Sequence, residues 1–240
     1  MRYISTSPED QAQLLKSLGL NSIEDLLRSI PEKIRLRLPL DLPKALTEPE
    51  LLRRFIEFEN QNVVKELCFL GAGVNQHFVP LVIDSLSSRG EFLTSYTPYQ
   101  AEISQGTLQA IFEFQTLICQ LTGMEISNAS MYDGSSALAE AVLMAARISR
   151  RNRLLIAQTI HPEYRSVVNT YTRHQELILE TIGCQQDSCI DQTKLESLMG
   201  PDVGAVVVQS PNFLGNLESL ESISTLCHRY GALLVVNITE

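Results

Sequence analysis

The segment DGSS at residues 133–136 holds the first group of side chains that could bind a ligand. An alanine-rich apolar run follows it, so the segment is predicted to begin a helix. The free N–H groups and the dipole at a helix start bind phosphate or carboxylate where that end faces a cleft. Asp, Gly and Ser also cap the start of ordinary helices. Two interpretations, an anion cradle and a helix cap, therefore apply to Asp133, Gly134, Ser135 and Ser136.

The loop SYTPYQAE at residues 95–102 is the second candidate. It holds Tyr96 and Tyr99 on either side of Pro98, which restricts the residue before it. Two tyrosines in a loop are costly to expose, and each offers a flat ring and a hydroxyl. The pair is expected either to line a pocket or interface, or to pack on its own domain.

A regular alternation of apolar and helix-like segments must position further polar residues from about residue 150 on. Strands that are apolar throughout and separated by helices are typical of a parallel sheet covered on both faces. The sequence therefore predicts an α/β fold. The predicted strands are 154–158, 177–182, 205–209 and 232–238, and the predicted helices lie at about 162–174, 191–199 and 217–230.

Ligands of such sheets bind beyond the carboxyl ends of the strands. His161, Asn212 and Asn237 follow the first, third and fourth apolar runs, so they are expected on one rim. The alternative for each is a polar loop residue that makes turn hydrogen bonds.

The first 66 residues are predicted to form short helices and an extended arm, as a domain separate from residues 67–240. One helix is expected from Ser7 to Gly19 and another from Ser22 to the residues before Pro31. A capping box at Thr47 begins a third. The apolar, proline-containing stretch IRLRLPLDLP at 34–43 joins them and is expected to wrap a partner.

The middle of the chain is predicted to alternate helices with a loop. A helix is expected near 78–88, loop structure over 89–102, and a second helix from a cap at Ser104 to Gly123. GAGVNQ at 71–76 lacks the third glycine of a dinucleotide fingerprint, which argues against a nicotinamide site.

Composition excludes several classes of function. The 240 residues carry a net charge of −9 without a basic block, which argues against a nucleic-acid partner. No apolar run approaches a membrane span, and no signal peptide is recognised. The five cysteines are expected to be reduced, buried thiols of a cytoplasmic protein. Since no histidine lies at ligand spacing from Cys184 and Cys189, no metal site is expected.

The segment from Glu91 to Arg147, EFLTSYTPYQAEISQGTLQAIFEFQTLICQLTGMEISNASMYDGSSALAEAVLMAAR, resembles the glycine cleavage system P-protein, glycine dehydrogenase (decarboxylating). More narrowly it is similar to subunit 1 of the two-subunit form. FLGAGVNQHFVP, HPEYRSVVNTY and QSPNFLGNLE extend the resemblance over the whole chain. Two departures stand out: Val74, Asn75 and Gln76 replace an aromatic and an Asp before His77, and the chain stops at NITE, where a C-terminal part is expected to be missing.

The resemblance implies an aminotransferase-like large domain of pyridoxal-phosphate fold type I. It also implies glycine decarboxylation on that cofactor, in a heterotetramer, and transfer of the aminomethyl group to the lipoyl arm of the H-protein. The site residues expected to face cofactor and substrate are Thr94, Tyr96, Tyr99 and His161.

The resemblance also implies that the cofactor lysine lies on subunit 2. The sequence fits this, since none of the five lysines of this chain, at 16, 33, 44, 65 and 194, follows a predicted strand. An acid at the start of DGSS would repel a phosphate dianion, which favours the helix cap there. This chain would then complete a shared site without holding a Schiff-base lysine. The alternative hypothesis is a non-catalytic scaffold that stabilises the lysine-bearing subunit and docks the H-protein.

Overall fold

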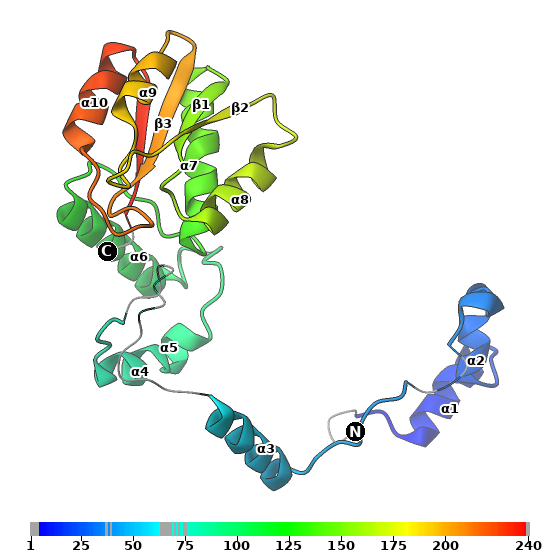
Figure 1. The fold of residues 1–240 in the computed structure, drawn as a ribbon. Coiled ribbons are helices and arrows are strands. Elements are labelled where there is room, and N and C mark those ends of the chain that lie inside the picture. The colour runs from blue at the N-terminus through cyan, green and yellow to red at the C-terminus, as the bar shows by residue number, and fades with distance from the viewer. Residues whose placement is uncertain are drawn as a thin grey trace. The chain divides into compact units, whose positions relative to one another are not determined.

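The computed structural model describes residues 5–36, 38, 40–62, 69, 71, 73 and 76–238 (Figure 1). The chain divides into two compact units, residues 1–66 and residues 67–240. Lys65 and the departure at Val74 and Asn75 lie outside the described residues.

The first unit consists of short helices whose starts are capped by their own side chains. In α1 (Pro8–Ser17), Ser7 and Asp10 form a reciprocal capping box. The predicted box at Thr47 also forms, since Glu50 accepts the Thr47 backbone N–H at 2.8 Å at the start of α3 (Glu48–Gln61). The other elements are α2 (Ile23–Leu26), η1 (Leu27–Ser29) and η2 (Glu32–Ile34).

The single helix predicted from Ser22 onwards is wrong in length. One α-helical turn, α2, is followed by the 3-10 turn η1, and the chain is extended at Ile30. Pro31 accounts for the extended backbone of Ile30, because a proline disfavours helical backbone in the residue before it.

The arm of the first unit exposes its apolar side chains. Between η2 and α3, the described residues form neither helix nor strand. Leu36, Leu38, Leu40 and Leu42 are each at least 66% exposed, and no described residue of this unit is buried. The unit therefore has no core of its own among these residues.

The second unit begins with helices α4 (Leu81–Ser87), α5 (Gly90–Leu93), α6 (Gln105–Thr122) and α7 (Gly134–Ser149). Gly123 ends α6 in the left-handed conformation at φ 71°, as predicted. Two expectations are wrong: α5 forms a helical turn inside the predicted loop, and Ser104 makes no side-chain cap. The backbone of Ser104, at φ −108° and ψ 17°, lacks the extended conformation of a capping residue.

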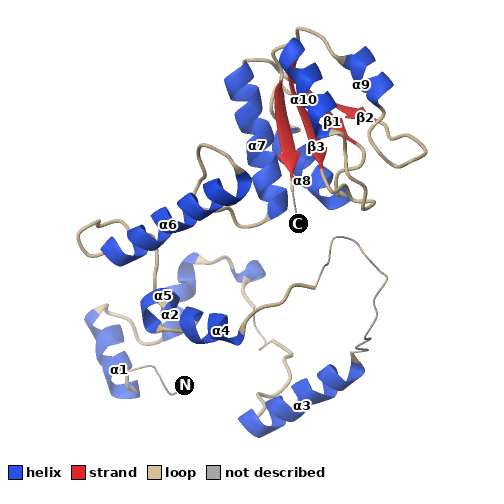
Figure 2. Cartoon of the chain, turned by 90° about the vertical axis from the view of Figure 1, so that its left-hand side faces the viewer, coloured by secondary structure: helices blue, strands red, loops and turns tan. Residues whose placement is uncertain are grey.

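A four-stranded parallel sheet forms the centre of the second unit, which confirms the predicted α/β fold. Its order is β2-β1-β3-β4, with α7 and α8 against one face and α9 and α10 on the other (Figures 1 and 2). The strands are β1 (Arg153–Ala157), β2 (Ile178–Ile182), β3 (Val203–Gln209) and β4 (Leu233–Asn237). The helices between them are α8 (Pro162–Thr172), α9 (Gln192–Leu198) and α10 (Leu220–Arg229).

The sheet is apolar on both faces because helices cover both. Every residue of β3 is buried, and Leu154 and Leu155 of β1 and Ile182 of β2 are fully buried as well. In parallel register, Ala205 pairs with both Leu154 and Leu233, which fixes the height of the three strands relative to one another.

Arg151 joins this core to the loop before β4. Its Nη1 donates to the carbonyl oxygens of Val203 (2.7 Å), Tyr230 (3.1 Å) and Gly231 (3.1 Å). The guanidinium therefore satisfies backbone acceptors at the amino end of two strands. Charged donors of this kind stabilise more than neutral ones.

Replacing Arg151 with Met is expected to lower the free energy of unfolding by about 1–3 kcal/mol, because it leaves these carbonyl acceptors unsatisfied. Arg150→Met is the matched control, since it removes the same charge one residue earlier. Urea unfolding followed by circular dichroism measures both. Equal losses in the two variants would contradict the role given to Arg151.

Candidate functional site

The carboxyl edge of the sheet gathers the loops that follow the strands. His161 and Asn212 both lie there, after β1 and β3, and Asn237 is the last residue of β4. The backbone N–H of His161 donates to Oε1 of Gln209, the last residue of β3, at 2.9 Å. This bond fixes the loop after β1 against the neighbouring strand.

His161 is held on three sides. Its Nδ1 accepts the backbone N–H of Glu163 at 3.2 Å, so the neutral ring carries its proton on Nε2. The ring stacks on Tyr164 (centroids 4.9 Å apart, planes at 27°) and meets the edge of Phe213 (4.7 Å, 70°). A Cβ at Gly73 would lie 3.4 Å from His161 Cδ2, so Gly73 also approaches the ring. We call His161, Tyr164 and Phe213 the aromatic cluster.

Tyr164, Phe213 and Gln209 did not stand out in the sequence. Tyr164 and Phe213 lie within HPEYR and SPNF, the segments already expected at the rim, so proximity in sequence was the available signal. Gln209 is a polar end to an apolar strand, and its burial at 4% exposure marks it as a partner rather than a solvent-facing residue.

The start of α7 is capped by its own acid. Asp133 accepts the Ser136 backbone N–H at 2.7 Å and the Ser135 hydroxyl at 2.5 Å. These bonds, the Ser135 hydroxyl first, hold the pKa of the Asp133 carboxyl below its usual range. The hydroxyl of Tyr164 lies so close to Gly134 that a Cβ there would be 2.7 Å from it. The acid thus takes the position that a bound anion would need.

The tyrosine loop stands open on the second unit. Tyr96 and Tyr99 are 87% and 83% exposed and make no ring contact with the described residues. The Thr94 hydroxyl, just after α5, donates to the carbonyl of Gly90, the first residue of that helix. The two rings are therefore not packed on the described part of their own unit.

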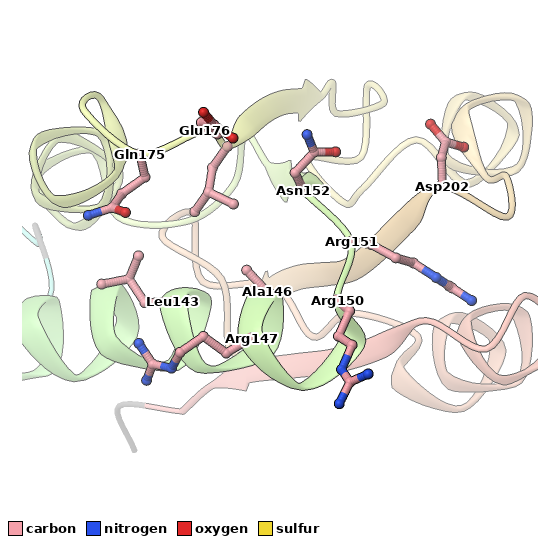
Figure 3. A pocket seen from close by; sticks show the side chains of 10 residues that line it. Leu143, Ala146, Arg147, Arg150, Arg151, Asn152, Gln175, Glu176 and Asp202 are labelled. Atoms are coloured by element: carbon pink, nitrogen blue, oxygen red, sulfur yellow. The ribbon is translucent and has the colours of Figure 1, made fainter.

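A cavity of about 700 Å³ lies at the opposite end of the sheet (Figure 3). Three of its lining residues directly precede strands: Asn152 comes before β1, Leu177 before β2 and Asp202 before β3. It therefore opens at the amino ends of the strands, away from the aromatic cluster. Its other lining residues are Leu143, Ala146, Arg147, Arg150, Arg151, Gln175 and Glu176.

In the described part of the chain, no three His, Cys, Asp or Glu side chains form a cluster able to hold a metal ion. The expectation of buried thiols is correct for Cys227, whose burial raises its pKa to about 11. It is wrong for Cys184, which is exposed, while Cys119 and Cys189 are half-buried and Cys68 lies outside the described residues. Across the described residues, no helix is both long and apolar enough to cross a membrane.

The described residues do not fit a covalently held pyridoxal phosphate. That cofactor needs a lysine for its Schiff base and donors for its phosphate. Lys194, the one described lysine of the second unit, is exposed in the first turn of α9 and is separated from β2 by residues 183–193. At the start of α7, Asp133 already occupies the donors of Ser135 and Ser136.

The contact between Gly134 at the start of α7 and the Tyr164 ring can be tested by substitution. Gly106→Ala in α6, where a Cβ meets nothing within 4 Å, is expected to raise the free energy of unfolding by roughly 0.5–1 kcal/mol through helix propensity. Gly134→Ala is expected to lower it by about 1–3 kcal/mol, because the Tyr164 ring must move. Denaturant unfolding compares the two, and a gain at both positions would show that Tyr164 does not press on α7.

Sequence comparisons identify relatives along the whole chain. The model of the glycine cleavage system P-protein family matches residues 1–239. The chain is 49% identical over 241 residues to a probable glycine dehydrogenase (decarboxylating) subunit 1 from Koribacter versatilis, covering 100% of this chain and 54% of the relative. It is 46% identical to the protein of the same name from Brevibacillus brevis, with 98% and 53% covered. The chain thus spans about half the length of these curated relatives.

Solved structures confirm the expected fold. A glycine decarboxylase (P-protein) of the glycine cleavage system, in inhibitor-bound form, matches 98% of this chain and 53% of its own, with a TM-score of 0.80 and 44% identity. A sphingosine-1-phosphate lyase from Burkholderia pseudomallei matches 86% of this chain and 51% of its own, with a TM-score of 0.60 at 12% identity, and so shows likeness of fold alone. On the family match and these identities, the chain belongs to the glycine cleavage system P-protein family.

Proposed function

We propose that this chain is part of subunit 1 of a two-subunit glycine decarboxylase. The enzyme releases CO2 from glycine on pyridoxal phosphate and passes the aminomethyl group to the lipoyl arm of the H-protein. The observation that carries the proposal is that the carboxyl edge of the sheet holds an ordered cluster of side chains but no described lysine. Its aromatic cluster is fixed by hydrogen bonds and ring contacts, yet no described lysine lies where a cofactor would be held.

The cofactor is assigned to the lysine-bearing partner subunit. A phosphate dianion at the start of α7 would face the Asp133 carboxylate, whose hydrogen bonds keep it ionised. Because the two negative charges repel each other, Asp133 serves as the cap of α7 and not as part of a phosphate site. When bound to the partner, pyridoxal phosphate supplies an electron sink for the decarboxylation.

The tyrosine loop is this chain's proposed contribution to the shared site. Glycine offers almost no side chain, so its pocket must be small, and its carboxylate must lose water before CO2 leaves. Tyrosine rings can close such a pocket while their hydroxyls orient the carboxylate or the cofactor. The high exposure of Tyr96 and Tyr99 supports this role, because both rings are free to meet a partner. Thr94 and His161 are proposed to face the same space.

The arm of the first unit is proposed to lie on the partner subunit. Leu36, Leu38, Leu40 and Leu42 expose a row of apolar side chains in a segment that no described residue of its unit buries. Such a row loses contact with water only by covering another surface.

The same exposed leucines favour a second candidate function. In that case the chain is a scaffold that stabilises the lysine-bearing subunit and docks the H-protein, and it contributes nothing to chemistry. The two functions differ in what they require of the tyrosine loop, which only the first one needs.

Tyr96→Phe and Tyr99→Phe, made in the complete two-subunit enzyme, distinguish the two. Each is expected to slow the exchange of bicarbonate into glycine by about 10²–10³, as for the loss of a well-placed donor in a dry site. Assembly should remain intact, because only a hydroxyl is removed. Tyr171→Phe on α8, also exposed, is the matched control and should leave the rate unchanged.

Sedimentation of each variant complex accompanies the rate measurement. If both loop variants assemble and exchange bicarbonate at the parental rate, the loop has no part in the chemistry and the scaffold function replaces the proposal.

A further inference from the structure

The carboxylate of Glu218 is buried near the carboxyl edge of the sheet, and none of the roles described above involves it. Glu218 is 6% exposed. Its Oε1 accepts the Thr159 hydroxyl at 3.0 Å and Nδ2 of Asn212 at 2.8 Å, and its Oε2 accepts the backbone N–H of Ile190 at 2.9 Å. No described basic side chain forms an ion pair with it.

A charge in this position is expensive unless every lone pair it buries is met. Here three neutral donors surround the carboxylate, and two of them have fixed orientations. The Ile190 N–H belongs to the backbone. The Asn212 amide is held because its Oδ1 accepts the backbone N–H groups of Leu214 and Asn216 at 3.0 and 3.1 Å. A group that can only accept is therefore required at residue 218.

The three donors come from three different loops. Thr159 follows β1, Ile190 follows β2, and Asn212 follows β3. Further bonds connect the same loops: the Phe213 backbone N–H donates to the Thr159 carbonyl at 2.9 Å, and Asn212 Nδ2 also donates to the Ser188 carbonyl at 2.9 Å. Glu218 is thus the point at which the loops of three adjacent strands are joined.

These loops carry the aromatic cluster. His161 lies two residues after Thr159, and Phe213 follows Asn212 directly, with their ring centroids 4.7 Å apart. A change in the distance between the loops after β1 and β3 therefore changes the contact between these rings. Misplacement of site groups by about 1 Å can cost on the order of 10²-fold in rate.

We propose that Glu218 is a positioning residue, which sets the His161–Phe213 contact by holding the loops after β1, β2 and β3 together. The proposal rests on the proposed function for its effect on catalysis. Its effect on the position of His161 is independent of that function.

Glu218→Gln tests the proposal with little change of volume. The Gln side chain must place its NH2 group opposite either the Ile190 N–H or the Asn212 NH2. Two hydrogen-bond donors then face each other with no acceptor between them. Glu221→Gln in the first turn of α10 is the matched control, because it removes the same charge from an exposed position. Thr159→Val is a milder second variant, since it removes one donor from Oε1 and keeps the shape.

The first measurement needs no activity. Nuclear magnetic resonance of the full-length subunit labelled with ¹³C-histidine resolves His161 from the three other histidines of residues 1–240, with His161→Gln used for assignment. Glu218→Gln and Thr159→Val are expected to shift the His161 ring signals, because the ring currents of Phe213 and Tyr164 then act from new positions. Glu221→Gln is expected to leave them in place. Unshifted His161 signals in both test variants would overturn the proposal.

The second measurement separates positioning from stability. In the assembled two-subunit enzyme, well below its unfolding temperature, Glu218→Gln is expected to lower kcat for glycine–bicarbonate exchange by about 10–100-fold. KM for glycine should change less than threefold, and Thr159→Val should follow with a smaller loss of kcat. A lowered unfolding temperature with parental kcat in both variants would reduce Glu218 to a stabilising residue and overturn the proposal. If Glu218→Gln fails to assemble, Thr159→Val alone decides by the same criterion.

Failure of the proposed function would look different. Tyr96→Phe and Tyr99→Phe would then both exchange bicarbonate with glycine at the parental rate, while the His161 signals would still shift in Glu218→Gln.

Discussion

The parallel register of β1, β3 and β4 is the constraint on which the rest of the second unit depends. Parallel strands begin at one edge of a sheet and end at the other, so every loop that follows a strand emerges on the same side. Because β3 is buried along its whole length between β1 and β4, this register is set by apolar packing on both faces. The sheet alone therefore brings the polar residues of the carboxyl edge together. Contacts between these residues are needed only to fix the orientation of each loop and side chain.

The contacts that fix these orientations come from side chains whose hydrogen bonds are made within the chain. Asp133 caps α7, Gln209 holds the backbone at His161, and Glu218 joins three loops. What the described part of this edge leaves for a ligand or partner is rings, exposed loops and the buried Nδ2 of Asn237, which has no hydrogen-bond partner. This distribution is what a subunit would have if it shaped a site whose reactive lysine and cofactor lie on its partner.

The strands could be predicted from the sequence to within two residues and the helices α4, α6, α8, α9 and α10 to within three. Their signals are local: unbroken apolar runs for β1 to β4, a glycine at the end of α6, and a capping box at Thr47. Where a local signal was ambiguous, the prediction was wrong. Ser104 has the residue type of a cap but not the backbone conformation, and the helix that Ser22 begins changes to a 3-10 turn after Leu26.

The parts of the candidate site that sequence reasoning missed depend on contacts between distant residues. Glu218 and Thr159 are 59 residues apart, and Gln209 and His161 are 48 apart. No periodicity or spacing motif encodes such a pair. Glu218 also reads as an ordinary acid shortly before a helix, and its burial becomes evident only when three loops close around it.

The central claim is that this chain shapes a site without holding its cofactor. Borohydride reduction fixes pyridoxal phosphate to the lysine that holds it, and peptide mapping of the reduced two-subunit enzyme then identifies that lysine. Since residues 1–240 contain only five lysines, the map is unambiguous for this chain. The account predicts stoichiometric label on one lysine of the partner subunit and only weak, scattered label here. Stoichiometric label on a single lysine of this chain would contradict it.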